Sequence, residues 1–179
     1  MKVLAIVGSL RQESWNYKVA KFIQERFQDK LELEIVGIDL PIFSEDMEEK
    51  PPQIVLDFKE KVDRAEGVLF VTPEYNHSIP GGLKNAIDWC SRVHRPLANK
   101  PCFIVGASTG NVGTARCQLD LRNILNAPGV AALCLPGNHV QLPEVQNSFD
   151  ENGNFIDSKS EKYMGKVIDA FLEWAGRFQ

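Results

Sequence analysis

Cysteine and histidine are scarce in this sequence. Its 179 residues include three histidines and four cysteines, which are Cys90, Cys102, Cys117 and Cys134. No two cysteines form a Cys-x-x-Cys pair, and no cysteine and histidine combine at the spacing of a zinc site. The sequence therefore predicts no metal site, and a chain of this length can bury a sizeable core without metals or disulfides.

Long hydrophobic runs and an excess of positive charge are absent as well. The early apolar run from Val3 to Val7 is too short to span a membrane or to form the core of a signal peptide. Lys and Arg number 20 against 24 Asp and Glu, and the net charge of −4 offers no broad surface to nucleic acid or an anionic membrane. We therefore expect a folded cytoplasmic protein with reduced thiols, and neither nucleic acid nor a membrane among its partners.

Short β-rich runs alternate with helical stripes along the chain. Most of the strand runs are apolar without interruption, which is typical of parallel strands covered on both faces. The alternation predicts a three-layer α/β sandwich with right-handed crossovers, in a single domain over residues 1–179. Strands are expected at 3–7, 31–38, 67–72, 103–105 and 130–135, and helices at 15–27, 53–64, 83–90, up to about 126, and 163–178.

Two segments fall outside this alternation. Residues 39–52 carry the acidic Glu45, Asp46, Glu48 and Glu49 and are expected to form a solvated loop. Residues 136–157 form a long polar excursion, which either covers the ligand crevice or contacts a neighbouring subunit.

Unusual polar residues gather in the loops after the first, third and fourth strands. In open parallel sheets the ligand crevice lies at the carboxyl ends of the strands, where such loops meet. The first loop carries Ser9, Arg11, Ser14 and Asn16 ahead of a helix N-terminus. Hydroxyls, an amide and a guanidinium at such a place are suited to phosphate, although neither GxGxxG nor GK[ST] is present. The alternative is that Ser14 only caps the helix and Arg11 is a surface charge.

The other two loops offer flat, polar surfaces. In 72–82, Tyr75 and Asn76 present an aromatic face and an amide, which a planar heterocycle with a polar edge would use. His77 has no evident acidic partner and is expected to be solvated or bonded to backbone. The loop 106–113 is small, polar and rich in glycine, which permits close approach to a flat ligand.

The three loops together resemble those of one family. The segments GSLRQESWN, TPEYNHSIPGGLKNAIDW and GASTGNVG are similar to those of the NADPH-dependent FMN reductases, in the flavodoxin-like group that includes bacterial azobenzene, quinone and chromate reductases. The resemblance covers nearly the whole chain in element order. It implies a flavodoxin-like fold with a five-stranded parallel sheet of order 2-1-3-4-5, and FMN at the point where the strand order reverses.

The resemblance also implies a set of cofactor-binding residues. The phosphate and ribityl end of FMN would be held by Ser9, Arg11, Ser14 and Asn16, with Trp15 beside them. The isoalloxazine ring would be bordered by Pro73, Glu74, Tyr75 and Asn76, with Ser78 nearby, and its other edge by Ser108, Thr109 and Gly110. Tyr17, where the family often has a basic residue, and Glu13 depart from the pattern and make the site less positive.

The activity that the resemblance implies is a hydride relay. NADPH or NADH would reduce FMN and leave, and a small-molecule acceptor such as a quinone, an azo dye, chromate or free flavin would then take two electrons. Because FMN would supply the chemistry, we assign no catalytic acid or base. Members of this group are commonly homodimers or homotetramers, so we expect self-association.

Trp89 bears on that expectation. It is rotated by about 200° from Ile87 on a helix of 3.6 residues per turn, and is therefore predicted to face outward, away from the core. With Val93 it would mark a subunit contact; the alternative is a single exposed aromatic residue. Cys90 and His94 lie one turn apart, but we expect Cys90 to be a buried, inert thiol.

Two other functions remain open from the sequence. The segment from Gly106 to Gly110 also matches G-x-S-x-G, the nucleophile turn of α/β-hydrolases, with Ser108, Asp120 and His139 in the required order. Residues 111–113 argue against it, since they delay the helix that should follow Ser108 directly. A flavodoxin-type electron carrier would share the fold and FMN, but would not react with a nicotinamide by itself.

Overall fold

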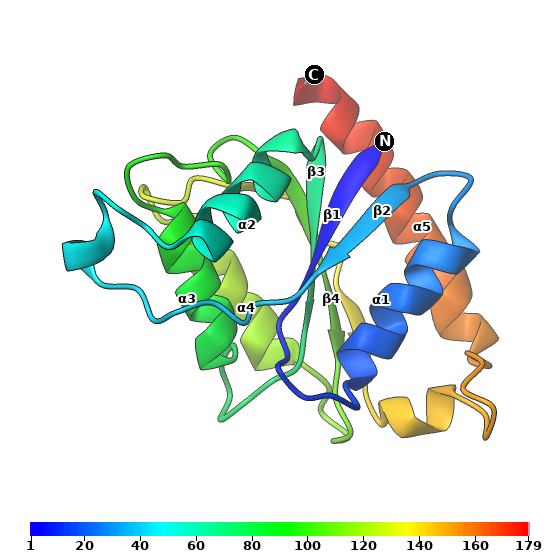
Figure 1. Cartoon of the computed structure of the whole chain (residues 1–179). Helices are drawn as coiled ribbons and strands as arrows, with labels where there is room; N and C mark the ends of the chain where they lie inside the picture. The colour runs from blue at the N-terminus through cyan, green and yellow to red at the C-terminus, as the bar shows by residue number, and fades with distance from the viewer. Residues whose placement is uncertain (179) are drawn as a thin grey trace.

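A parallel sheet lies between two layers of helices in the computed structural model, which describes residues 1–178 (Figure 1). The strands are β1 (Lys2–Val7), β2 (Glu32–Val36), β3 (Gly67–Thr72), β4 (Pro101–Ala107), β5 (Leu133–Cys134) and β6 (Val140–Leu142). The α-helices are α1 (Trp15–Arg26), α2 (Gln53–Arg64), α3 (Gly81–Cys90), α4 (Ala115–Leu125) and α5 (Ser158–Ala175). Three short 3-10 helices are η1 (Glu45–Met47), η2 (Val145–Ser148) and η3 (Gly176–Phe178).

The strand order is β2-β1-β3-β4-β5, all parallel, with β6 also paired to β4. The predicted order 2-1-3-4-5 is therefore confirmed. The order reverses between β1 and β3, because the chain runs from β1 to one side of the sheet and from β3 to the other. This leaves a crevice between the loops at the carboxyl ends of the two strands. None of the helices in the described part of the chain has both the length and the apolarity needed to cross a membrane.

The uninterrupted apolar strands have a core on each face. In β1, Val3 and Val7 pack in the cluster that α1 and α5 cover, whereas Leu4 and Ile6 pack in the cluster that α2, α3 and α4 cover. Figure 1 shows these two helical layers on opposite sides of the sheet. Successive side chains of a strand point to opposite faces, so a strand with helices on both faces favours apolar residues along its whole length.

The fifth position of the sheet is shared by two short strands. The expected strand at 130–135 is reduced to β5, because the chain turns away at Pro136 and at Gly137, whose φ is +74°. It returns as β6, which pairs with the last residues of β4. Residues 136–157 are thus partly inside the sheet, and the aromatic pairs Trp15–Phe149 and Phe22–Phe155, with ring centroids 5.5 and 4.2 Å apart, hold the rest against α1.

The prediction that Trp89 faces outward is wrong. Its side chain is 3% exposed, its Nε1 donates to the carbonyl of Pro41 at 2.7 Å, and its ring packs edge-on against Phe43. The helical geometry was right about the core stripe, but the loop after β2 folds over this second face of α3. The same loop is less solvated than expected, since Glu48 forms an ion pair with Arg92 at 2.6 Å.

Gly106 offers a test of how tightly β4 meets α4. A Cβ at this position would overlap the Thr114 hydroxyl and lie 2.9 Å from Gln118 Nε2. We expect Gly106→Ala to lower the free energy of unfolding by about 1–3 kcal/mol, the usual cost of overpacking. Gly37→Ala is the matched control, because nothing lies within 4 Å of its Cβ, and it should change stability by no more than about 0.5 kcal/mol. Urea denaturation of both variants measures the difference, and equal stabilities would contradict this packing.

Candidate functional site

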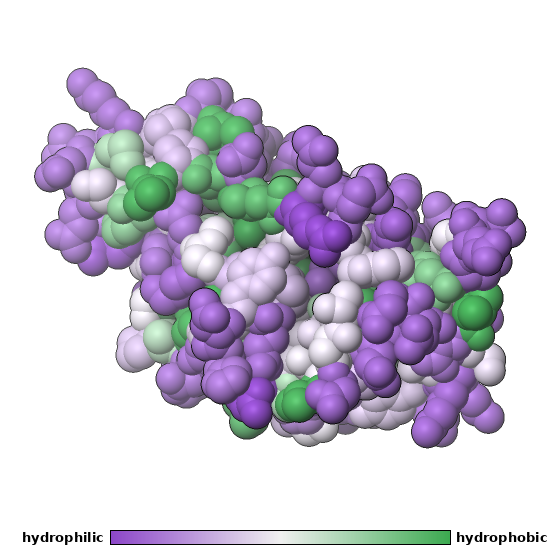
Figure 2. All heavy atoms as spheres, turned by 90° about the horizontal axis from the view of Figure 1, so that it is seen from below, coloured by the Kyte–Doolittle hydropathy of each residue, from purple (hydrophilic) through white to green (hydrophobic). Residues whose placement is uncertain are grey.

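The loops after β1, β3 and β4 converge at one edge of the sheet, which Figure 2 views from below. They enclose a hollow of about 120 Å³. It is lined by Ser9, Arg11, Ser14, Trp15, Asn16, Pro73, Glu74, Tyr75, Ala107, Ser108 and Thr109. Ten of the thirteen predicted cofactor-binding residues are in this lining; Asn76, Ser78 and Gly110 are not.

The first loop ends at the N-terminus of α1. Ser14 is the N-cap, and its hydroxyl accepts from the backbone N–H of Tyr17 at 3.3 Å. The capping that the sequence left as an alternative is therefore present, but one hydroxyl satisfies only one of the first N–H groups, and those of Trp15 and Asn16 stay available to an anion. Arg11 is exposed in the same loop.

The acidic Glu13 weakens this anion site less than the sequence suggested. Its carboxylate lies 3.5 Å from the ammonium of Lys18, one turn into α1. An exposed pair of this kind contributes little to stability, but it offsets the negative charge at the loop.

Asn16 links the first loop to the end of β4. Its Nδ2 donates to the carbonyl of Ala107 at 2.9 Å, and the N–H of Ala107 donates to its Oδ1 at 3.2 Å. The side chain is 3% exposed, so these two bonds satisfy an amide that burial would otherwise penalise. Asn16 therefore positions the loop, and its amide is largely engaged within the protein.

The second loop contains a tight turn. Tyr75 and Ser78 exchange two backbone hydrogen bonds of 3.0 Å, and Asn76 and His77 between them have φ values of +50° and +67°. Positive φ at both central residues is the pattern of a type I′ turn, which costs energy in residues other than glycine. Tyr75 is 48% exposed beside the hollow, and His77 is exposed, as expected for a solvated side chain.

Helix α4 holds this turn in place. The carboxylate of Glu74 accepts from the backbone N–H of Cys117 at 3.0 Å and from Arg116 Nη1 at 3.3 Å, and the Ser78 hydroxyl donates to Asp120. Burial raises the pKa of the Cys117 thiol to about 12. The polar atoms of Glu74 and Ser78 thus fix the loop, which leaves the Tyr75 ring and the backbone of the turn for a ligand.

The third loop rests on β6, an element that the sequence analysis did not predict. The N–H of Ser108 donates to the carbonyl of Leu142 at 3.0 Å, and the N–H of Val145, just after β6, donates to the carbonyl of Ser108 at 3.0 Å. The alternation of Val140 and Leu142 was the signal available for this strand, although three residues are too few to distinguish it from a loop. The hydroxyl of Ser108 accepts from the N–H of Gly110 at 3.1 Å.

A serine-hydrolase triad is not assembled. Asp120 is bonded to Ser78, and within residues 1–178 no hydrogen bond joins His139 to Ser108 or to Asp120. Burial and the nearby Arg122 lower the pKa of His139. The helix also starts late, at Ala115, which separates Ser108 from the sharp strand-to-helix turn that a nucleophile elbow needs.

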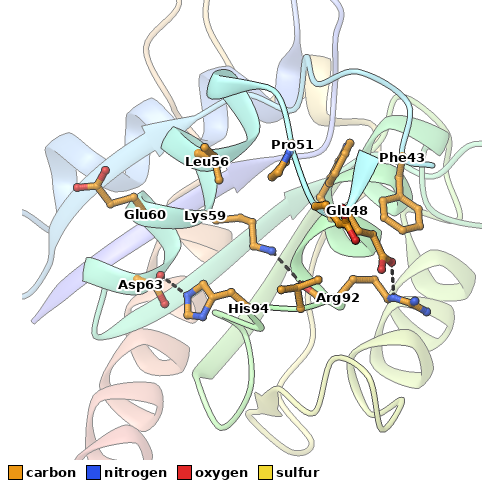
Figure 3. Close-up of a pocket in the computed structure, with 12 residues that line it drawn as sticks. Phe43, Glu48, Pro51, Leu56, Lys59, Glu60, Asp63, Arg92 and His94 are labelled. Carbon is orange, nitrogen blue, oxygen red and sulfur yellow. Dashed lines mark hydrogen bonds and ion pairs between the residues drawn. The ribbon is translucent and has the colours of Figure 1, made fainter. Parts of the chain in front are cut away.

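A larger cavity of about 350 Å³ lies elsewhere, between the loop after β2, α2 and the end of α3 (Figure 3). Four carboxylates line it, namely Glu48, Glu49, Glu60 and Asp63. Figure 3 shows Arg92 engaged with Glu48 and Asp63 with His94, and Lys59 bonded to the Arg92 carbonyl. An acidic lining repels phosphate, so the smaller hollow at the sheet edge is the better anion site.

Comparison with known proteins identifies the family of the chain. The family model described as "NADPH-dependent FMN reductase" matches residues 1–147. A relative from Vibrio ruber, an NADH:(hydroxy)cinnamate reductase subunit, is 38% identical over 96% of this chain and 86% of its own. A quinone reductase of Escherichia coli is 36% identical over 99% of this chain and 96% of its own.

A solved structure shows the same fold. FerB, a flavoenzyme NAD(P)H:(acceptor) oxidoreductase from Paracoccus denitrificans, superimposes with a TM-score of 0.84 at 33% identity, over 99% of this chain and 98% of FerB. The flavodoxin-like fold is thus confirmed, as is the family resemblance carried by the three loops. This chain belongs to the NADPH-dependent FMN reductase family.

Proposed function

We propose that this protein binds FMN in the hollow at the sheet edge and passes a hydride from NADPH or NADH to a small two-electron acceptor of the quinone class. The observation that carries the proposal is the convergence of an anion-binding helix N-terminus, Arg11 and the exposed Tyr75 turn on one hollow. Bound FMN would accept the hydride from the nicotinamide and deliver it to the acceptor.

The residues present fit such a cofactor. A dianionic phosphate would meet Arg11, the Ser9 hydroxyl and the first N–H groups of α1, which are the donors that phosphate prefers. The hollow is smaller than the roughly 300 Å³ usual for a whole drug-sized ligand, so it suits the phosphate and ribityl end. A flat ring has the half-exposed Tyr75 and the small Ser108 and Thr109 at the rim.

The role of the protein's own residues is to bind the cofactor and to orient it. Arg11 and Ser9 supply charge and hydrogen bonds to the phosphate, Asn16 fixes the loop that carries them, and the turn at 75–78 presents backbone donors to a polar ring edge. No residue is assigned to proton transfer, since Glu74 is bonded to α4 and His77 lies exposed in the turn. The open crevice accepts planar substrates of several shapes, and the E. coli relative acts on quinones by its name.

Self-association and a cytoplasmic location belong to the same proposal. Large apolar side chains are exposed, with Leu10 in the first loop at 62% and Leu119 on α4 at 64%. Figure 2 shows hydrophobic patches interrupting the hydrophilic surface of this face. Exposed apolar patches favour protein contacts, and a homodimer or homotetramer would cover them.

Arg11 tests the phosphate site. Loss of a charge-assisted hydrogen bond of about 1.5–3 kcal/mol should weaken FMN binding by the Arg11→Ala variant roughly 10- to 150-fold. Riboflavin, which lacks the phosphate, should bind the variant and the native protein equally. Flavin fluorescence titration of the apoprotein measures all four affinities.

A matched control comes from Arg64→Ala, which removes an exposed arginine of α2 that pairs with Glu60 far from the hollow. It should leave FMN affinity unchanged. An Arg11→Ala variant that lost FMN and riboflavin to the same extent would contradict phosphate recognition by Arg11.

The reductase and the electron carrier differ in one assay. The FMN-loaded protein should oxidise NADPH or NADH continuously when a benzoquinone is added, with the parallel-line kinetics of a ping-pong sequence. A protein that retained FMN but oxidised neither nucleotide without a partner reductase would be a carrier. A colourless protein that took up no FMN would overturn both.

Leu119 tests self-association. Leu119→Asp places a charge on an exposed position of α4, where it should not disturb the monomer but would be buried in an interface that includes this face. We expect sedimentation velocity to show a smaller species for the variant than for the native protein. An unchanged oligomer would place the interface elsewhere.

A further inference from the structure

Two cysteines face each other across the last pair of strands. Cys102 of β4 is the register partner of Cys134 of β5, and both side chains lie on the face of the sheet that α4 covers. Neighbouring strands are about 4.7–4.9 Å apart, which is within the Cα separation of about 4.4–6.8 Å that a disulfide spans. The two strands need not separate or slide for these sulfurs to be joined.

The two thiols differ in environment. Cys102 is fully buried, and burial raises its pKa well above the usual value. Cys134 is partly exposed on the edge strand, and its sulfur accepts a hydrogen bond from Arg122 Nη1 at 3.2 Å. The hydrogen bond from Cys102 and the charge of Arg122 lower the pKa of Cys134, and outweigh the opposing effect of burial.

Arg122 is held beside this sulfur by the backbone. Its guanidinium donates to the carbonyl of Leu135 at 2.7 Å and to that of Asn138 at 3.1 Å, where the chain leaves β5. Within residues 1–178 no carboxylate pairs with it, and its Nε is buried without a hydrogen-bond partner. The positive charge therefore remains available to stabilise a thiolate at Cys134.

The other two cysteines lack this arrangement. Cys90 and Cys117 are both fully buried in the core under α3 and α4, and burial raises the pKa of each to about 12. Cys134 is thus the one thiol of the four that combines partial exposure, a guanidinium and a second thiol within reach. These are the properties of cysteines that react with peroxides.

We propose that Cys134 and Cys102 form a peroxide-sensitive pair, in which Cys134 is oxidised first and Cys102 resolves it to a disulfide. The Cys134 thiolate attacks one oxygen of hydrogen peroxide, so that an S–O bond forms, the O–O bond breaks and hydroxide leaves. The sulfur loses two electrons, and the peroxide gains them. The Cys102 sulfur then attacks the sulfenic sulfur, and the hydroxyl leaves with the Cys102 proton as water.

The disulfide would act on the part of the sheet that supports the candidate site. It would join β5 covalently to β4 and remove the thiol with which Arg122 forms a hydrogen bond. The same guanidinium also bonds to the carbonyls of Leu135 and Asn138. That chain leads directly into β6, which supports Ser108. The pair does not depend on FMN or on the proposed reaction.

Peroxide treatment followed by peptide mapping tests the proposal on the full-length, FMN-loaded protein without nicotinamide. Native protein should form a Cys102–Cys134 disulfide that dithiothreitol reverses. In Cys102→Ala, dimedone, a trap for sulfenic acids, should label Cys134. In Cys134→Ala, Cys102 should stay reduced. Arg122→Gln should slow the modification of Cys134, because a smaller fraction of this sulfur would be thiolate without the guanidinium.

Cys90 is the internal control in every sample, and it should remain unlabelled throughout. Labelling of Cys90 as fast as Cys134 would mean that general unfolding exposes the thiols, and would overturn the proposal. So would native protein in which Cys134 accumulates the dimedone adduct as in Cys102→Ala, since Cys102 would then resolve nothing. The experiment uses no enzymatic readout, so its failure is distinct from failure of the reductase function.

Discussion

The candidate site depends above all on the pair of hydrogen bonds between the Asn16 amide and the backbone of Ala107. These bonds join the start of α1 to the end of β4, two segments that are 91 residues apart in the chain. They add to the bond from the N–H of Gly8 to the carbonyl of Val71, which ties the start of the same loop to β3. A buried, doubly bonded amide gives a fixed direction to the N–H groups that follow Ser14, and that direction is what an anion site requires.

The opposite wall is held by a different device. The side chains of Glu74 and Ser78 form hydrogen bonds with α4, so a turn with two residues at positive φ stays in one conformation. Backbone strain of this kind persists where the surroundings determine it, and it is common at ligand sites. Both walls are thus formed before any ligand arrives, which reduces the ordering cost of binding.

The sequence was most informative where local pattern and tertiary environment agree. It placed α2 and β3 at their observed bounds, since an amphipathic stripe and an uninterrupted apolar run each admit one interpretation. The strand order came from the family resemblance, because apolar runs do not say which strands are neighbours. Trp89 was misplaced since its cover comes from a loop 48 residues away, which helical geometry does not include.

The site, like the fold, was predicted where local sequence was enough and missed where distant contacts decide. The loops were found from residue types, and the structure brings ten of the thirteen residues to one hollow. The sequence could not distinguish a residue that faces the ligand from one that holds the loop. Asn16 and Glu74 hold loops, because their hydrogen-bond partners lie at the end of β4 and in α4. The support from β6 was missed for a related reason: a strand of three residues has too little pattern to detect.

The most direct test of the claim that the sheet-edge hollow binds the FMN phosphate is a structure from crystals grown in the presence of FMN. The account predicts the phosphate within hydrogen-bonding distance of Arg11 and of the first N–H groups of α1, with the Asn16–Ala107 bonds intact. FMN bound in the acidic cavity beside Lys59, or a hollow left empty at saturating FMN, would contradict it.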